Sequence, residues 1–154
     1  CFGDGSGTPC PCGNSGTPGH GCENSSQSGG TLLTATGEAR VSGDSLLLFA
    51  SGLTPTAPTL FFQGNETLNG GLGVVFGDGL RCVQGNAVRI ATRTASAGMS
   101  SYGAPAGDIP VSQRGAVPPA GGTRFYQAWY RNVAAFCTPS GFNLSNAIQV
   151  TWLP

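Results

Sequence analysis

The chain has 154 residues, a formal net charge of zero and 9% charged residues, and its seven basic residues of the Lys/Arg type are all arginine. This length suits one domain with a buried core. The absence of a basic patch argues against nucleic-acid binding, and no apolar run approaches the roughly 18 residues of a membrane-spanning helix.

Residues 1–30 form a distinct zone, which we call the N-terminal arm. The arm is rich in glycine and serine, contains four of the six cysteines and has almost no aliphatic residues. It cannot build a core alone, so we expect disulfides or a partner to hold it. Because the sequence opens at Cys1 rather than Met, we also expect a mature chain from which a leader has been removed.

The pattern changes at residue 31, where short apolar or alternating segments begin. Gly, Pro, Asn or Asp separates each segment from the next, at a spacing typical of sandwich strands. We therefore predict an all-β fold for residues 31–154, an Ig-like antiparallel β-sandwich of about seven to nine strands. The expected strands lie in residues 31–41, 44–52, 58–64, 71–77, 86–95, 108–117, 123–132 and 146–154.

Alternation is clearest in residues 124–131. A strand places successive side chains on opposite faces of its sheet. The segment should therefore carry two different faces, one with Phe125, Gln127, Trp129 and Arg131 and the other with Tyr126, Ala128 and Tyr130.

An even number of cysteines in a lysine-free chain favours three disulfides formed in an oxidising compartment. This predicts an extracellular or cell-surface location. We expect a Cys82–Cys137 bridge within residues 31–154. In the arm we favour Cys1–Cys10 with Cys12–Cys22, and the crossed alternative, Cys1–Cys12 with Cys10–Cys22, stays open.

The sequence contains candidate ligands for two kinds of metal site, zinc and calcium, and neither site is favoured. Cys10, Cys12, His20 and Cys22 have the side-chain types of a zinc site, but one residue between the first two cysteines is too short a spacing. Asp4 and Asp78, each within a copy of the tetrapeptide FGDG, are weak calcium candidates without a later acidic ligand. We expect no metal or cofactor, and we interpret both FGDG copies as Asp-Gly turns.

No arrangement of residues points to catalysis. The single histidine, His20, lies in the arm, and no G-x-S-x-G motif is present, so we predict that the chain is not an enzyme. Its aromatic residues are candidates either for a sugar-stacking platform or for the core. N-glycosylation patterns occur at Asn24, Asn65 and Asn143.

Several motifs together resemble a family of secreted, cysteine-rich proteins of planctomycete-like environmental bacteria. They are CFGDGSGTPCPCGN, LFFQG, FGDGLRC, FYQAWYRN and FCTPSGFNLSNAIQVTW, and they extend over most of the chain. The resemblance implies export and an Ig-like β-sandwich, and it implies no enzymatic role.

From these features we expect a structural subunit of an extracellular, pilus-like filament or surface assembly. The partner would be another copy of the chain, joined head to tail by arm or strand exchange. The rival hypothesis is a monomeric carbohydrate-binding or adhesion module with Trp129, Tyr126 and Tyr130 exposed. The expected assembly segment is Thr31, Leu32, Leu33, Thr34, Ala35 and Thr36.

Overall fold

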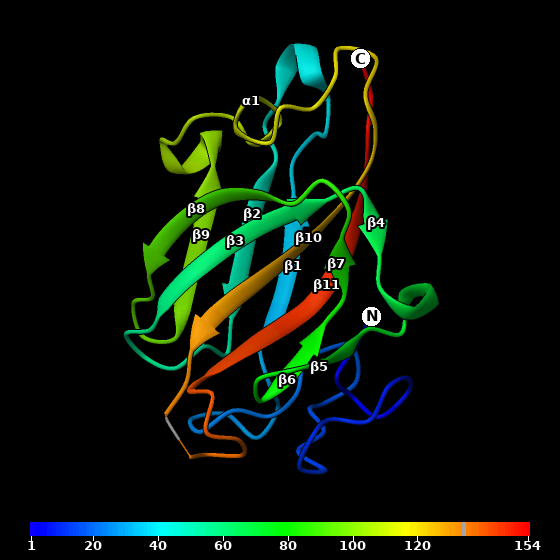
Figure 1. The fold of residues 1–154 in the computed structure, drawn as a ribbon. Coiled ribbons are helices and arrows are strands. Elements are labelled where there is room, and N and C mark those ends of the chain that lie inside the picture. Colours follow the sequence, from blue (N-terminus) through cyan, green and yellow to red (C-terminus); the bar gives the residue numbers. More distant parts are fainter. Residues whose placement is uncertain (134) are drawn as a thin grey trace.

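The computed structural model describes residues 1–133 and 135–154, and most of its regular structure is β-strand (Figure 1). The only α-helix in the described residues is the single turn α1 (Val111–Arg114), and η1 (Val41–Gly43), η2 (Asn69–Gly71) and η3 (Ala104–Ala106) are 3-10 turns. The predicted all-β class is confirmed. The strands are β1 (Leu32–Thr36), β2 (Leu47–Ser51), β3 (Pro58–Gly64), β4 (Glu66–Thr67), β5 (Val74–Phe76), β6 (Gly79–Arg81), β7 (Val83–Gln84), β8 (Val88–Thr94), β9 (Met99–Gly103), β10 (Gly122–Arg131) and β11 (Phe142–Trp152).

Two larger antiparallel sheets organise the molecule. One has the strand order β1-β2-β9 and the other β11-β10-β3-β8. In Figure 1 the three-stranded sheet lies behind the four-stranded sheet. The small pairs β4–β7 and β5–β6 lie beside the four-stranded sheet, on the side turned away from the three-stranded one.

The main core lies between the two larger sheets. Leu33, Leu48 and Tyr102 come from the three-stranded sheet, and they share one buried cluster with residues of the four-stranded sheet such as Phe61 and Trp152. This follows from the alternating pattern of the strands, because each sheet turns its apolar face toward the other.

Strand β10 has the two faces that its sequence predicts. Tyr126, Ala128 and Tyr130 are fully buried in the main core. On the opposite face, Phe125 and Trp129 pack against a second, smaller cluster centred on Phe62, Cys82, Val83, Leu144 and Ala147. We call the side of the four-stranded sheet that carries this second cluster its outer face.

Two features of the sheet region differ from the sequence prediction. Residues 108–117 contain the helical turn α1 rather than a strand, because Pro110 precedes it and the Asp44 carboxylate accepts a hydrogen bond from the Ser112 backbone N–H at 2.7 Å. Such a bond satisfies one of the free donors at a helix start. The strands β4, β6, β7 and β9, by contrast, lie outside the segments predicted as strands.

The predicted disulfides require correction. The structure pairs Cys1 with Cys82, Cys10 with Cys22 and Cys12 with Cys137, over Cα–Cα distances of 5.8, 6.0 and 5.8 Å. The expected pairs Cys1–Cys10, Cys12–Cys22 and Cys82–Cys137 are all absent, and only the Cys10–Cys22 bridge of the open alternative occurs.

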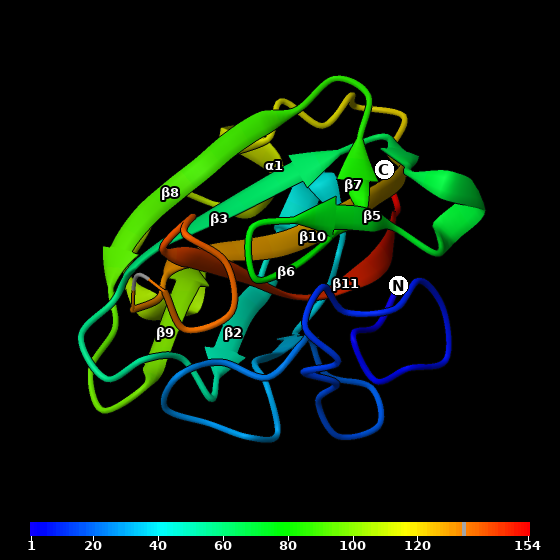
Figure 2. The same ribbon diagram turned by 60° about the horizontal axis from the view of Figure 1, so that its bottom comes forward.

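The reason for the different pairing is that the arm, besides folding on itself, packs against the body (Figure 2). The Ala147 N–H of β11 donates to the Cys1 carbonyl at 3.0 Å, which brings Cys1 next to Cys82. Further along the arm, the Asn143 side-chain amide donates to the Glu23 carbonyl at 2.8 Å. Two of the three disulfides therefore join the arm to residues 31–154.

No helix in the described part of the chain is long and apolar enough to cross a membrane.

Candidate functional site

The zinc candidates do not form a metal site. Cys10, Cys12 and Cys22 are all in disulfides, and the Nδ1 atom of His20 lies 3.0 Å from the Thr17 hydroxyl. Within the described residues, no group of three or more metal-binding side chains comes together. The cysteines of this region thus form disulfide cross-links between turns instead of binding a metal.

The calcium candidates Asp4 and Asp78 both accept hydrogen bonds from the protein. Asp4 accepts the Gly19 N–H at 2.8 Å, and this bond, followed by that from the Ser6 hydroxyl, lowers the pKa of the Asp4 carboxyl. The buried Asp78 accepts from the backbone and hydroxyl of Thr138, both at 2.8 Å, and from the Asn132 amide at 2.8 Å. These bonds give each carboxylate a structural role.

The two FGDG copies form different turns. In the first copy Gly5 has a φ of 87°, as an Asp-Gly turn requires, whereas in the second the positive φ of 63° is at Gly77, before Asp78. The second copy thus closes the β5–β6 hairpin with Gly at the first central position. A side chain at Gly77 would collide with the ring of Phe142.

Two of the three predicted glycosylation positions are enclosed by the fold. Asn24 donates to the Tyr130 hydroxyl at 3.0 Å and to the Gly52 carbonyl at 2.8 Å, and Asn143 is also fully buried. The folded chain has no room for a glycan at either position, because each amide already donates to buried acceptors. Asn65 is exposed, and glycosylation there stays a prediction.

The tyrosines expected on a sugar-binding platform are core residues. Tyr126 accepts from the Trp152 indole N–H at 2.9 Å and donates to Gln63 at 2.7 Å. Burial raises the pKa of both Tyr126 and Tyr130, because the charged phenolate is disfavoured away from water. The exposed placement of these two side chains is therefore wrong, and Trp129 is the member of the set that faces outward from β10.

A groove of about 530 Å³ lies on the outer face of the four-stranded sheet. Its floor consists of side chains that lie opposite one another in the register of neighbouring strands. Leu60 on β3 lies between Trp129 on β10 and Thr92 on β8, and in the next row Phe62 lies opposite Arg89. Opposite residues in an antiparallel sheet share a face, so the register itself builds an apolar floor with a polar edge at β8.

The β5–β6 hairpin forms one wall of this groove. Phe76 packs on Phe142 with a centroid distance of 4.9 Å, and Phe142 packs on Trp129 at 5.4 Å. The guanidinium of Arg131 lies over the Trp129 ring, 5.3 Å from its centroid. Three aromatic rings and one cation therefore form a continuous ladder from the hairpin to the end of β10.

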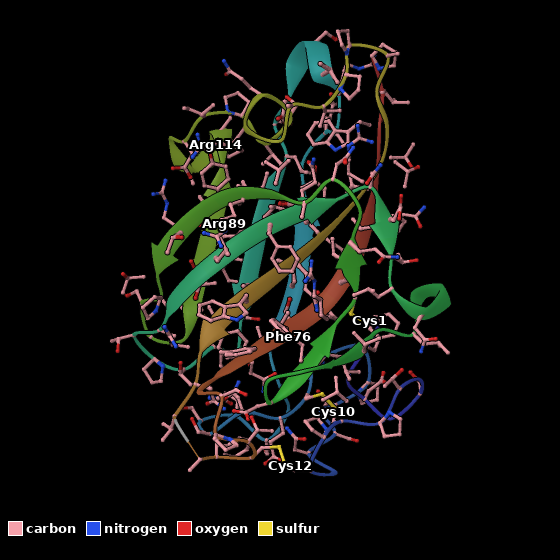
Figure 3. All side chains as sticks on the ribbon, in the orientation of Figure 1. Cys1, Cys10, Cys12, Phe76, Arg89 and Arg114 are labelled. Carbon is pink, nitrogen blue, oxygen red and sulfur yellow. A yellow bond between two sulfur atoms is a disulfide. The ribbon has the colours of Figure 1, made fainter. Side chains whose placement is uncertain are left out.

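Two further arginines line the groove, Arg81 from β6 and Arg89 from β8. Figure 3 shows Arg89 and Phe76 on the same side of the four-stranded sheet, the side that faces away from the three-stranded one. Arg81 donates from Nε to the Val83 carbonyl at 3.1 Å. The one ion pair found among the described residues joins Arg93 to Asp108, outside the groove, so neither groove arginine is neutralised by a carboxylate there.

A second hollow, of about 500 Å³, lies at the seam between β8 and β9. Its charged groups already have partners within the fold. Arg93 pairs with Asp108 and lies over the Tyr102 ring at 5.4 Å, and Arg114 donates to the Ile90 carbonyl at 2.9 Å. These contacts close the seam, so we take the groove on the outer face as the candidate functional site.

Part of this groove is predictable from the sequence. Alternation places Trp129 on the face of β10 opposite Tyr126 and Tyr130, whereas Phe76, Arg81 and Arg89 have no predicted role. The alternation within residues 86–95 carries the signal for Arg89, because the side chain of buried Ile90 must point the other way. Nothing in the sequence near Phe76 and Arg81 shows that their hairpin lies beside β10.

Comparisons with protein families, with curated proteins and with solved structures find no match to this chain. The function is therefore argued from the groove.

Proposed function

We propose that this chain is an extracellular carbohydrate-binding or adhesion module that holds a sugar on the outer face of its four-stranded sheet. The observation that carries the proposal is the groove with an apolar, aromatic floor beside partly exposed Trp129. An aromatic ring in an open groove offers a flat surface on which the C–H face of a pyranose packs, while the nearby polar groups meet its hydroxyls.

The form and position of the groove support this proposal. The floor belongs to a sheet whose other face is the main core, so its side chains are held in place by the rigid register of β3, β8 and β10. A preformed site loses less conformational entropy on binding than a flexible loop does. The threonine at the edge, Thr92, adds a hydroxyl that can both donate and accept.

We propose an extracellular location because three disulfides form and persist in an oxidising compartment. We also propose that the two larger sheets form a sandwich of the Ig-like type, with the small strand pairs β4–β7 and β5–β6 as additions at its outer face. On such a sandwich the loops and the outer faces of the sheets are the surfaces free for recognition.

The proposal is tested by measuring binding to an array of oligosaccharides and by calorimetry with those that bind. Trp129→Ala should lower the affinity about tenfold or more, because it removes the largest exposed ring of the floor. Phe2→Ala is the matched control, since Phe2 is an exposed aromatic, 42% accessible, on the arm. Failure of every oligosaccharide to bind, or equal loss in both variants, would rule out the groove as a sugar site.

Self-assembly is a second candidate function, and the free edge of β5 favours it. Val74, Val75 and Phe76 are all exposed on a strand that pairs with β6 alone. An exposed apolar edge of this kind offers backbone donors and acceptors to another chain. The segment Thr31–Thr36, by contrast, is engaged within its own chain, because β1 pairs with β2 and the Asn146 amide bridges to Leu33.

Negative-stain microscopy and sizing of native material test this second candidate. If β5 joins copies, polymers should form, and Val75→Asp should return them to monomers by placing a charge in the interface. Ile109→Asp is the control, since Ile109 is equally exposed but lies away from β5. A monomer at every concentration would exclude assembly of the purified chain.

A further inference from the structure

The groove on the outer face carries positive charge although the chain as a whole is neutral. Arg81 and Arg89 line it from different strands, and none of the residues that line it is acidic. A neutral sugar needs no cation, so these two charges call for a separate explanation.

The contacts of the two arginines leave most of their donors unused. Within the described residues Arg81 donates only from Nε, to the Val83 carbonyl, which orients its guanidinium and leaves the terminal amino groups free. Arg89 is exposed and forms no hydrogen bond to another described residue. A guanidinium presents paired N–H donors that match the oxygens of a carboxylate or sulfate.

The distribution of groups across the groove specifies the ligand further. In the register of the sheet, Phe62 on β3 lies between Gln127 on β10 and Arg89 on β8. A bound ring that packs on the apolar floor near Phe62 and Trp129 would therefore place its substituents toward Arg89 at the β8 edge and toward Arg81 at the hairpin wall. A pyranose that bears an acidic group satisfies both the floor and the edge.

We propose that the ligand of this groove is an acidic polysaccharide, whose carboxylate or sulfate groups pair with Arg81 and Arg89 while its rings pack on the floor. This inference rests on the proposed sugar-binding function and deepens it. Two arginines beside an apolar floor suit a chain with one charge per sugar better than a nucleic acid, which carries a charge at every phosphate and requires a larger basic patch.

Calorimetry with three oligosaccharides of equal length tests the proposal on the full chain. The probes are oligogalacturonate with carboxylates, a carrageenan oligosaccharide with sulfates and a cello-oligosaccharide without charge. At least one acidic probe should bind at least about tenfold more tightly than the neutral one, as expected for a charge-assisted hydrogen bond. This preference should shrink as salt is raised, because the groove is open to solvent. Comparison of the oligogalacturonate with the carrageenan probe shows whether the groove prefers a carboxylate or a sulfate.

Variants separate this inference from the function on which it rests. Arg89→Gln should lower the affinity for the acidic probe about tenfold and lower that for the neutral probe much less. Arg40→Gln is the control, since Arg40 donates to the Pro154 carbonyl, outside the groove. If all three probes bind equally and only Trp129→Ala removes binding, the sugar site stands and the acidic ligand is wrong. If a single-stranded oligonucleotide binds and no oligosaccharide does, both are wrong.

Discussion

The two faces of the four-stranded sheet are built from the same strands but differ in what covers them. On β10 the inner residues Tyr126, Ala128 and Tyr130 are completely buried against the three-stranded sheet. The outer residue Gln127 is equally buried, whereas its neighbour Trp129 is partly exposed. The inner face is thus uniformly core, and the outer face is divided into a covered part and an open part.

The cover of the outer face comes from β6, β7 and the arm. Gln127 donates to the carbonyls of Leu80 and Ser145 at 2.8 and 2.7 Å, and it accepts the Cys82 N–H at 3.0 Å. These bonds fix β6 on top of β10 and β11, and the Cys1–Cys82 disulfide fixes the arm to the residue between β6 and β7. The groove is the part of the outer face that this cover leaves open, so the same contacts that build the second cluster also set the shape of the candidate site.

The largest effect should follow from damage to the inner face. Trp152→Ala should lower the free energy of unfolding by about 3–5 kcal/mol, because it leaves a cavity in the main core and removes the N–H bonded to Tyr126. Urea unfolding followed by tyrosine fluorescence measures this loss. Trp129→Ala on the outer face is the matched comparison and should cost far less. Equal losses for the two tryptophans would mean that the faces do not differ in this way.

The next effect should follow from releasing the cover. The double variant Cys1→Ser/Cys82→Ser should lower the free energy of unfolding by about 2–4 kcal/mol, since this bridge constrains a sequence separation of 81 residues in the unfolded chain. Cys10→Ser/Cys22→Ser is the control, because its separation is 12 residues and its loss should be smaller. The reverse order would show that the arm bridge does not hold the outer cover in place.

The inner face was largely predictable from sequence, whereas the outer cover was not. Period-two alternation identifies which side chains of residues 124–131 share a face, and burial of Tyr126 and Tyr130 in the core was one of the two alternatives left open for them. Alternation carries no information on which distant segment lies over a face. The pairing of Cys1 with Cys82 depends on the position of the arm along β11, and sequence spacing instead favoured bridges within the arm.

In the candidate groove, too, strand alternation predicts some residues, whereas others depend on tertiary contacts. The sequence names Trp129 as a candidate together with Tyr126 and Tyr130, and strand alternation places it on the face opposite theirs without showing which face is the core. Arg89 was overlooked because a single arginine in a strand is ordinarily a solvated residue, and its significance depends on the β3–β8 register that places it opposite Phe62. Phe76 and Arg81 were overlooked because their hairpin reaches the sheet through a tertiary contact. The one-turn helix α1 stands where the sequence predicts a strand, because the hydrogen bond from the Ser112 N–H to Asp44 is also a long-range contact.

A smaller effect should follow from removing the side chain that joins the cover to the sheet. Gln127→Ala should lower the free energy of unfolding by about 1–3 kcal/mol, because the buried N–H of Cys82 and the carbonyls of Leu80 and Ser145 lose a partner. Gln149→Ala is the matched control on the neighbouring strand, where Gln149 is exposed, and it should be nearly neutral. Thermal unfolding of both variants makes the comparison, and a neutral Gln127→Ala would show that these bonds contribute nothing to stability.

The smallest effect concerns alkaline pH and belongs to the inner face. The chain has no lysine and three tyrosines, and burial raises the pKa of Tyr102, Tyr126 and Tyr130 in the folded state. Stability that depends on neutral tyrosine is fully present below the unfolded pKa of about 10 and is lost as pH rises toward the higher folded pKa. Between about pH 10 and 11.5 the free energy of unfolding should fall by about 1 kcal/mol per pH unit for each buried tyrosine.

Urea unfolding across this range, with the ultraviolet absorbance of tyrosinate as a second readout, measures the effect. Tyr130→Phe should reduce the slope, because one buried phenol no longer resists ionisation, although it also leaves the Asn24 amide with one acceptor fewer and so lowers stability at neutral pH. Arg89→Gln, on the outer face, should leave the slope unchanged, since it removes no phenol. An unchanged slope in Tyr130→Phe would show that burial does not hold this hydroxyl neutral. The inner face would then not be closed to water at Tyr130, and it would not differ from the outer face in the way described.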